Sequence, residues 1–213
     1  MNNNKDKIIL DLCGGSGAWS KPYLDNGYTV INVTLPEYDV KTYAPPKNVY
    51  GILATPSCTM FSFARTHPKI PRNLQNGMEL VIACLKIIWE CQYRIEKETQ
   101  KKSPLKFWAL ENPWGMLNWF LGYPVLIFHP YEYQEKYSKK TCIWGHFTIP
   151  YKTDGIRRYD KKFDHLFMNE LIEIKKEEIK SIGDIIWKDV NTRQILRGIT
   201  PKGFSKAFYE ANK

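Results

Sequence analysis

Three short stretches of the sequence contain the residue types from which an active site can be built. TPSC ends in Cys58, whose thiolate can attack an electrophilic carbon. ALENPWG contains Glu111, a carboxyl group that can donate or accept a proton. DLCGGSG joins Asp11 to a run of glycines, whose backbone can approach a ligand closely. A thiol and a carboxyl group in one pocket would suit nucleophilic attack with general-acid assistance.

Each stretch also has an ordinary structural explanation when it is taken alone. Cys58 fits a buried structural thiol, and Glu111 fits a carboxylate beside a helix N-terminus. A glycine turn is often only a tight connection between two elements. Together the three favour a shared site, because each follows a short apolar run and the carboxyl ends of parallel strands meet at one sheet edge.

The elements that would position these stretches alternate between β and α. A helix is predicted over 18–27, and the longest helix over 74–100, where apolar residues recur at three- and four-residue steps. Strands are predicted from apolar and β-rich runs at 7–12, 28–34, 48–55, 106–110, 125–133 and 141–147. This order predicts an α/β fold with a mainly parallel sheet and helices on both faces.

The composition limits the class of protein. At 213 residues and 43% hydrophobic, the chain can form one domain with a sizeable core. Its net charge of +9 favours a polyanionic partner such as nucleic acid, although excess lysine also serves solubility alone. The five cysteines form no CxxC pair or Cys/His cluster, so we expect neither disulfides nor a metal site. Without a signal core or a long apolar run, we expect an intracellular protein with no membrane contact.

The stretches ILDLCGGSG, TPSCTMFS and ALENPWG, in this order, resemble motifs I, IV and VI of the DNA cytosine-5 methyltransferases, particularly the compact versions carried by bacteriophages. The resemblance extends from Ile8 to about Gly145. It implies a Rossmann-like methyltransferase fold, S-adenosylmethionine as cofactor and DNA as partner. It also implies an enzyme that works in the cytoplasm of a bacterial host.

The resemblance implies specific catalytic roles. Cys58 matches the nucleophile whose thiolate adds to carbon 6 of cytosine and so activates carbon 5 for methylation. Glu111 matches the acid that hydrogen-bonds ring nitrogen 3 and the exocyclic amine, with Asn112 and Pro113 holding its loop. Lys140 stands for one of the paired arginines of motif VIII and would support the cytosine carbonyl oxygen.

The resemblance also implies cofactor contacts, with some departures from the family. Cys13 stands where the family often has phenylalanine, and Thr34 stands near the usual ribose-binding acid, for which Glu37 is a possible substitute. Asp39 fits the acid that accepts a hydrogen bond from the adenine amine. The whole implied set is Asp11, Cys13, Gly15, Gly17, Thr34, Asp39 and Pro56.

Two further departures concern the nucleophile and the specificity region. Ser57 separates Pro56 from Cys58, whereas the family commonly has proline directly before the cysteine. We divide the chain into a catalytic core (1–150), a small basic insertion (151–196) and a C-terminal helix (197–213). The insertion is short for a target-recognition region, which predicts relaxed specificity or dependence on a protein partner.

Two alternative functions stay open from the sequence. An enzyme with the same thiolate chemistry can act on free pyrimidine nucleotides instead of DNA. A degenerate methyltransferase fold can also bind nucleic acid without catalysis, which Thr34, Ser57 and the missing arginines favour. The presence of both Cys58 and Glu111 argues against this second alternative, because a binding protein needs neither.

Overall fold

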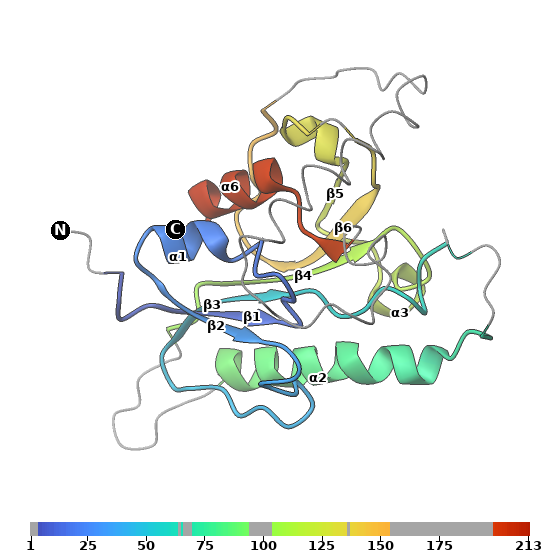
Figure 1. Cartoon of the computed structure of the whole chain (residues 1–213), viewed down its shortest axis with the longest axis horizontal. Coiled ribbons are helices and arrows are strands. Elements are labelled where there is room, and N and C mark those ends of the chain that lie inside the picture. The colour runs from blue at the N-terminus through green and yellow to red at the C-terminus, as the bar shows by residue number, and fades with distance from the viewer. Residues whose placement is uncertain (1–3, 64, 66–69, 94–103, 136, 154–197) are drawn as a thin grey trace.

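A six-stranded sheet lies at the centre of the computed structural model, which describes residues 4–63, 65, 70–93, 104–135, 137–153 and 198–213. Its strands are β1 (Ile8–Leu12), β2 (Thr29–Val33), β3 (Val49–Ala54), β4 (Phe107–Pro113), β5 (Leu126–Phe128) and β6 (Thr141–His146). They lie in the order β2-β1-β3-β4-β6-β5 (Figure 1). The first four are parallel, and β6 runs antiparallel to both of its neighbours. The predicted α/β class with a mostly parallel sheet is confirmed, and it is compatible with a Rossmann-like arrangement.

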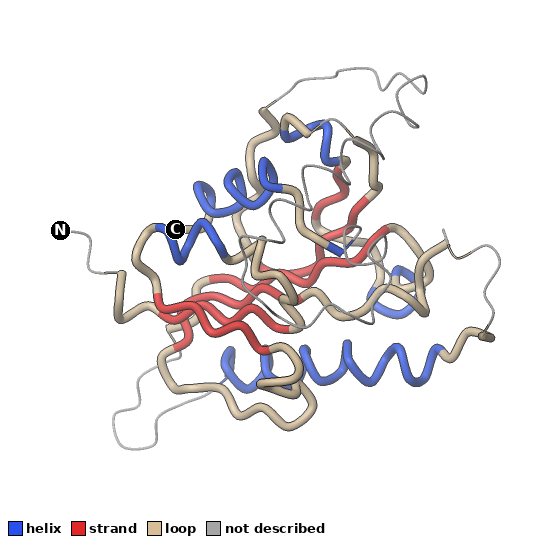
Figure 2. Tube along the Cα trace, in the orientation of Figure 1, coloured by secondary structure: helices blue, strands red, loops and turns tan. Residues whose placement is uncertain are grey.

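Helices cover both faces of this sheet (Figures 1 and 2). One face packs against α2 (Leu74–Tyr93). The other packs against α1 (Lys21–Asp25) and α6 (Lys202–Ala211), with the 3₁₀ turn η1 (Pro130–Tyr133) beside α6. The short helix α3 (Asn118–Leu121) follows β4. Because side chains alternate along a strand, each strand supplies apolar residues to both layers.

The layer beneath α2 explains the periodic apolar pattern of that helix. Val81, Cys84, Ile88 and Cys91 are buried at three- and four-residue steps against the sheet. The two cysteines therefore serve as small buried apolar side chains. The described part of the helix ends at Tyr93, and the remainder of the predicted range lies outside the described residues.

The opposite layer is dominated by aromatic rings. Phe204 of α6 stacks on Phe128 of β5 with ring centroids 4.1 Å apart, and Trp19 meets Phe208 edge-on at 5.3 Å. Asn212, just past α6, donates to Thr148 O and accepts from Thr148 N, both within 2.9 Å. The C-terminal helix therefore returns to the sheet and closes the core over α1.

Three sequence-based boundaries are wrong. The helix predicted over 18–27 is reduced to α1, because Pro22 has no N–H to donate to the carbonyl of residue 18 and so lies in the first turn of the helix. The strand predicted over 125–133 ends at Phe128, since Pro130 has no N–H and opens η1, while Glu132 accepts from His129 N. The strand predicted to end at residue 110 continues to Pro113, so the ENP residues belong to β4.

The basic insertion predicted over 151–196 lies outside the described residues except for 151–153, which are exposed. Along the ranges that the structure does describe, no helix combines the length and apolar character that a membrane crossing requires. The described elements position the strand-exit loops of β1, β3 and β4, which carry the predicted site residues.

Candidate active site

The loops after β1 and β3 emerge at the point where the strand order reverses. The chain passes from β1 outward to β2 and then returns to β3 on the other side of β1. In open α/β sheets, ligands bind outside the carboxyl ends of the strands at such a switch point. The stretches DLCGGSG and TPSC are therefore located where this architecture places a ligand.

The glycine-rich loop after β1 contains backbone conformations that favour glycine and a close contact that excludes a side chain. Gly15 and Gly17 have φ of +53° and +69°. A Cβ at Gly14 would lie 2.3 Å from Asp11 Cγ, so the loop can pass over this carboxylate only without a side chain. A Cβ at Gly15 would meet no atom within 4 Å, so the outer side of the loop is open.

Asp11 supports this loop from below. It is fully buried, it accepts a 2.6 Å hydrogen bond from Ser20 Oγ at one oxygen, and its other oxygen has no hydrogen-bond partner. Burial raises the pKa of Asp11 from 3.8 to about 6, against the lowering effect of its hydrogen bonds with Ser20. Close to neutral pH the Asp11 carboxyl group is therefore ionised while buried, which lowers the free energy of unfolding.

Asp11→Asn should change the pH dependence of stability. The folded-state pKa lies above the unfolded one, so the wild type is fully stabilised by this group below pH 4 and loses that stability as the pH rises to about 6. A shift of this size corresponds to roughly 3 kcal/mol. Urea unfolding at pH 4 and at pH 7.5 would give the free energy of unfolding of the variant minus that of the wild type. This difference should increase by up to that amount between the two pH values. An equal difference at both pH values would contradict the shift.

Two polar residues of β2 and its exit hold the glycine loop from the side. Thr34 Oγ1 accepts from Gly15 N at 3.2 Å, and Asn32 Nδ2 donates to Gly15 O at 3.0 Å. Thr34, predicted to lie near the cofactor ribose, is thus bonded to the loop itself. Sequence reasoning missed Asn32, whose only signal is a polar amide within an apolar strand.

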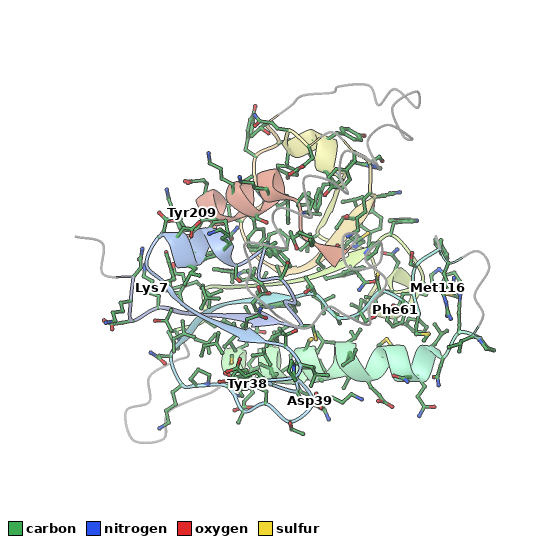
Figure 3. The ribbon with its side chains drawn as sticks, viewed as in Figure 1. Lys7, Tyr38, Asp39, Phe61, Met116 and Tyr209 are labelled. Carbon is green, nitrogen blue, oxygen red and sulfur yellow. The ribbon has the colours of Figure 1, made fainter. Side chains whose placement is uncertain are left out.

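Asp39 lies at the margin of this region. It is exposed, and its Oδ1 accepts from Lys41 N at 2.9 Å. Lys41 Nζ lies 2.6 Å from Glu79 of α2, and Figure 3 shows Tyr38 and Asp39 over that helix. A hydrogen bond from Cys84 lowers the pKa of Cys13, while burial and the charges of Asp11 and Asp39 oppose this.

Cys58 lies at the start of a tight turn after β3. Its carbonyl oxygen accepts from Phe61 N at 3.0 Å and Ser62 N at 2.9 Å, and the side chain is half-buried. Ser57 Oγ accepts from Thr59 N at 3.4 Å. Ser57, the residue directly before Cys58, thus stabilises the turn by a hydrogen bond. No disulfide includes Cys58.

Arg72 braces the same turn and was not predicted from the sequence. Its guanidinium donates to Met60 O and Ser62 O, both at 2.8 Å. The planar fork suits two carbonyl oxygens that follow one another along a turn. No local sequence signal identifies this role, because the contacts span ten and twelve residues.

Hydrogen bonds join the three strand-exit regions. Thr55 Oγ1 donates to Cys13 O at 2.8 Å, which ties the TPSC loop to the glycine loop. Asn112 Nδ2 donates to the buried Pro56 O at 2.9 Å, which ties the TPSC loop to the end of β4. Met116 N donates to Phe61 O at 2.9 Å, and Figure 3 shows these two residues side by side. The thiol turn and the strand of Glu111 are therefore directly bonded neighbours.

The two lysines before β6 have different surroundings. Lys139 Nζ lies 3.4 Å from Glu111 Oε1, and both side chains are largely buried. Lys140 is exposed, and its Nζ lies 3.6 Å from the centroid of the Trp114 ring, a cation–π contact. The ammonium group beside Glu111 therefore belongs to Lys139. Lys140, which is predicted to support the cytosine carbonyl oxygen, lies over Trp114 instead of beside the acid.

The remaining thiols lie in the core. Cys84, Cys91 and Cys142 are buried, and burial raises the pKa of Cys142 to about 12. Cys13 Sγ lies 4.0 Å from Cys84 Sγ beneath the glycine loop. Within the described ranges, no three His, Cys, Asp or Glu residues are grouped as metal ligands.

The structure thus connects most of the predicted residues through one set of contacts. Asp11, Cys13, Gly15, Gly17 and Thr34 form the glycine loop and its supports, and Pro56 and Asn112 join this loop system to β4. Glu111 pairs with Lys139, while Asp39 and Lys140 lie at the margins. No protein-family model and no curated protein matches the chain.

Proposed function

We propose that this protein is an S-adenosylmethionine-dependent methyltransferase that methylates carbon 5 of cytosine in DNA. The observation that supports this most strongly is the 2.9 Å hydrogen bond from Asn112 Nδ2 to Pro56 O. It joins the turn that carries the thiol to the strand that carries the acid. A thiol and a carboxyl group on bonded neighbouring segments are the parts needed for covalent activation of a pyrimidine ring.

The protein's own groups account for the activation of the base. The thiolate of Cys58 forms a bond to carbon 6, and the electron pair displaced from the ring double bond makes carbon 5 nucleophilic. Glu111 hydrogen-bonds ring nitrogen 3 and the exocyclic amine and so offsets the charge that develops on the ring. Lys139 holds the Glu111 carboxylate in place. After methylation, loss of the proton from carbon 5 to a base restores the ring double bond and releases the thiolate.

The glycine loop fits the cofactor in two respects. The space beside Gly15 is open, so a ligand can approach the backbone there. One buried side-chain oxygen of Asp11 and one of Asn32 have no hydrogen-bond partner. These oxygens give the region beneath the loop a negative electrostatic potential, which suits a ligand with ammonium and sulfonium groups. S-adenosylmethionine, when bound, supplies the methyl group that carbon 5 accepts.

A substrate series with 5-fluorocytosine tests the proposal. Fluorine at carbon 5 cannot leave as a proton, so an active thiolate stays bonded to carbon 6. Duplex DNA, single-stranded DNA and a free nucleotide, each with the fluorinated base, would be incubated with the protein and S-adenosylmethionine. Intact-mass spectrometry should find a covalent adduct on DNA, with the added mass located on the peptide containing Cys58.

The other outcomes separate the alternatives. An adduct with the free nucleotide alone would contradict the DNA proposal and identify a nucleotide-modifying enzyme. Absence of any adduct, with binding of DNA retained, would contradict catalysis and leave a nucleic-acid-binding protein. In the duplex, the target base must leave the stack to reach the thiol, so adducts should form faster at a mismatched cytosine than at a paired one.

A further inference from the structure

An exposed aromatic surface lies directly beside the thiol turn. It is formed by the rings of Phe63 and Trp119, whose side chains are 48% and 67% exposed. Phe120 and Tyr123, which follow Trp119 closely in the sequence, are 47% and 82% exposed. The ring centroids of Phe63 and Trp119 lie 6.1 Å apart, and the ring centroid of Phe120 lies 6.4 Å from that of the buried Phe61. Large aromatic side chains grouped at the surface mark an interaction site more often than isolated ones do.

The surface is firmly attached to the candidate active site. Ser62 forms a β-bridge with Gly115, and a Cβ at Gly115 would lie 2.4 Å from Phe61 O, so the two backbones pack closely. Trp144 Nε1 donates to Gly122 O at 2.9 Å and fixes the end of α3 to β6. The backbone that carries Phe63 and Trp119 is therefore held in place by these contacts. Phe63 lies five residues after Cys58 in the sequence.

The charge around the surface identifies the kind of partner. The described residues of the adjoining segments 56–75, 112–125 and 136–142 include four lysines and arginines and no aspartate or glutamate. They are Arg65, Arg72, Lys139 and Lys140, of which Lys139 is paired with Glu111 at the end of β4. The segments are in contact, because Trp114 N donates to Lys140 O at 2.9 Å and Met116 N to Phe61 O. Basic groups around exposed aromatic rings are the combination by which proteins bind single-stranded nucleic acid, with phosphates held by charge and bases by stacking.

We infer that this aromatic surface binds an unpaired stretch of polynucleotide and favours single-stranded over duplex substrate. The inference rests on the proposed function, since it names the form of nucleic acid delivered to Cys58. In a duplex both faces of each base are covered by neighbours, so the exposed rings have nothing to stack on. In a single strand each base presents a free face to Phe63 or Trp119.

Binding measured without S-adenosylmethionine tests the inference separately from methyl transfer. Fluorescence anisotropy would compare a labelled single-stranded oligonucleotide with its duplex at one salt concentration. The single strand should bind more tightly, and Trp119→Ala should weaken that binding about tenfold, because stacking contributes substantially for each base. Duplex binding should be unchanged by the substitution.

Trp89→Ala is the matched control. Trp89 is 50% exposed on α2, twelve residues beyond Gly77, where that helix packs against Phe61. This variant should bind the single strand as the wild type does. Equal weakening by both variants, or tighter binding of the duplex by the wild type, would overturn the inference. So would self-association that Trp119→Ala abolishes in sedimentation without change in oligonucleotide binding, because a second copy would then occupy the surface.

The two proposals can fail independently. An adduct with fluorinated DNA together with no effect of Trp119→Ala on binding would keep the methyltransferase proposal and reject the aromatic surface. Selective loss of single-strand binding without any adduct would keep the surface and reject the chemistry. Circular dichroism of each variant checks that the substitution at an exposed position leaves the fold intact.

Discussion

Cys58→Ala is expected to abolish both methyl transfer to cytosine and adduct formation with 5-fluorocytosine. Without the sulfur no bond to carbon 6 can form, and carbon 5 of an unactivated pyrimidine does not attack a methyl donor. Loss of an enzyme's covalent nucleophile typically lowers turnover by at least about 10³-fold. Transfer of radioactive methyl groups from S-adenosylmethionine to DNA measures the effect, and binding of DNA should be retained.

Cys91→Ala is the corresponding thiol control. Cys91 is buried near the C-terminal end of α2 and lies in the hydrophobic core. Its removal leaves a small cavity, so a modest loss of stability is expected with methyl transfer maintained at a temperature where the variant is folded. Residual transfer by Cys58→Ala close to the wild-type rate would show that carbon 5 is activated in another way, and the proposed mechanism would be wrong.

Glu111→Gln is expected to reduce turnover by about 10²- to 10⁴-fold, the range attributed to general acid catalysis. The amide keeps the shape of the side chain but cannot supply a proton or a negative charge to the base. The change should appear mainly in kcat, since phosphate contacts elsewhere dominate the affinity for DNA. Steady-state methylation assays separate kcat from KM.

The two lysines before β6 provide a matched pair for this prediction. Lys139→Met removes the ammonium group that lies 3.4 Å from Glu111 Oε1, whereas Lys140→Met removes only an exposed cation over Trp114. Turnover should fall more for Lys139→Met than for Lys140→Met, because only the first leaves the largely buried carboxylate without its ion pair. The opposite order would place the catalytic cation at Lys140, as the sequence alone suggests.

Local patterns were sufficient to predict the class of fold. Short apolar runs alternating with a helix of regular apolar spacing are determined by local burial. The strands β1, β2 and β3 and the start of α2 are therefore found where the pattern places them. Two predicted boundaries failed where a proline changed the local preference. Pro22 confines the start of α1 to Lys21, and Pro130 ends β5 early.

The candidate site shows the same division between local and long-range causes. The sequence alone was sufficient to identify Cys58, Glu111 and the glycine loop as candidate site residues, because each lies in a short stretch with a recognisable combination of residue types. Tertiary structure alone assigned Lys139 to Glu111, and Arg72 to the thiol turn. It also joined Asn112 to Pro56 across 56 residues. These pairings depend on the order of strands in the sheet and on the directions of side chains at its edge, which no local pattern of residues specifies.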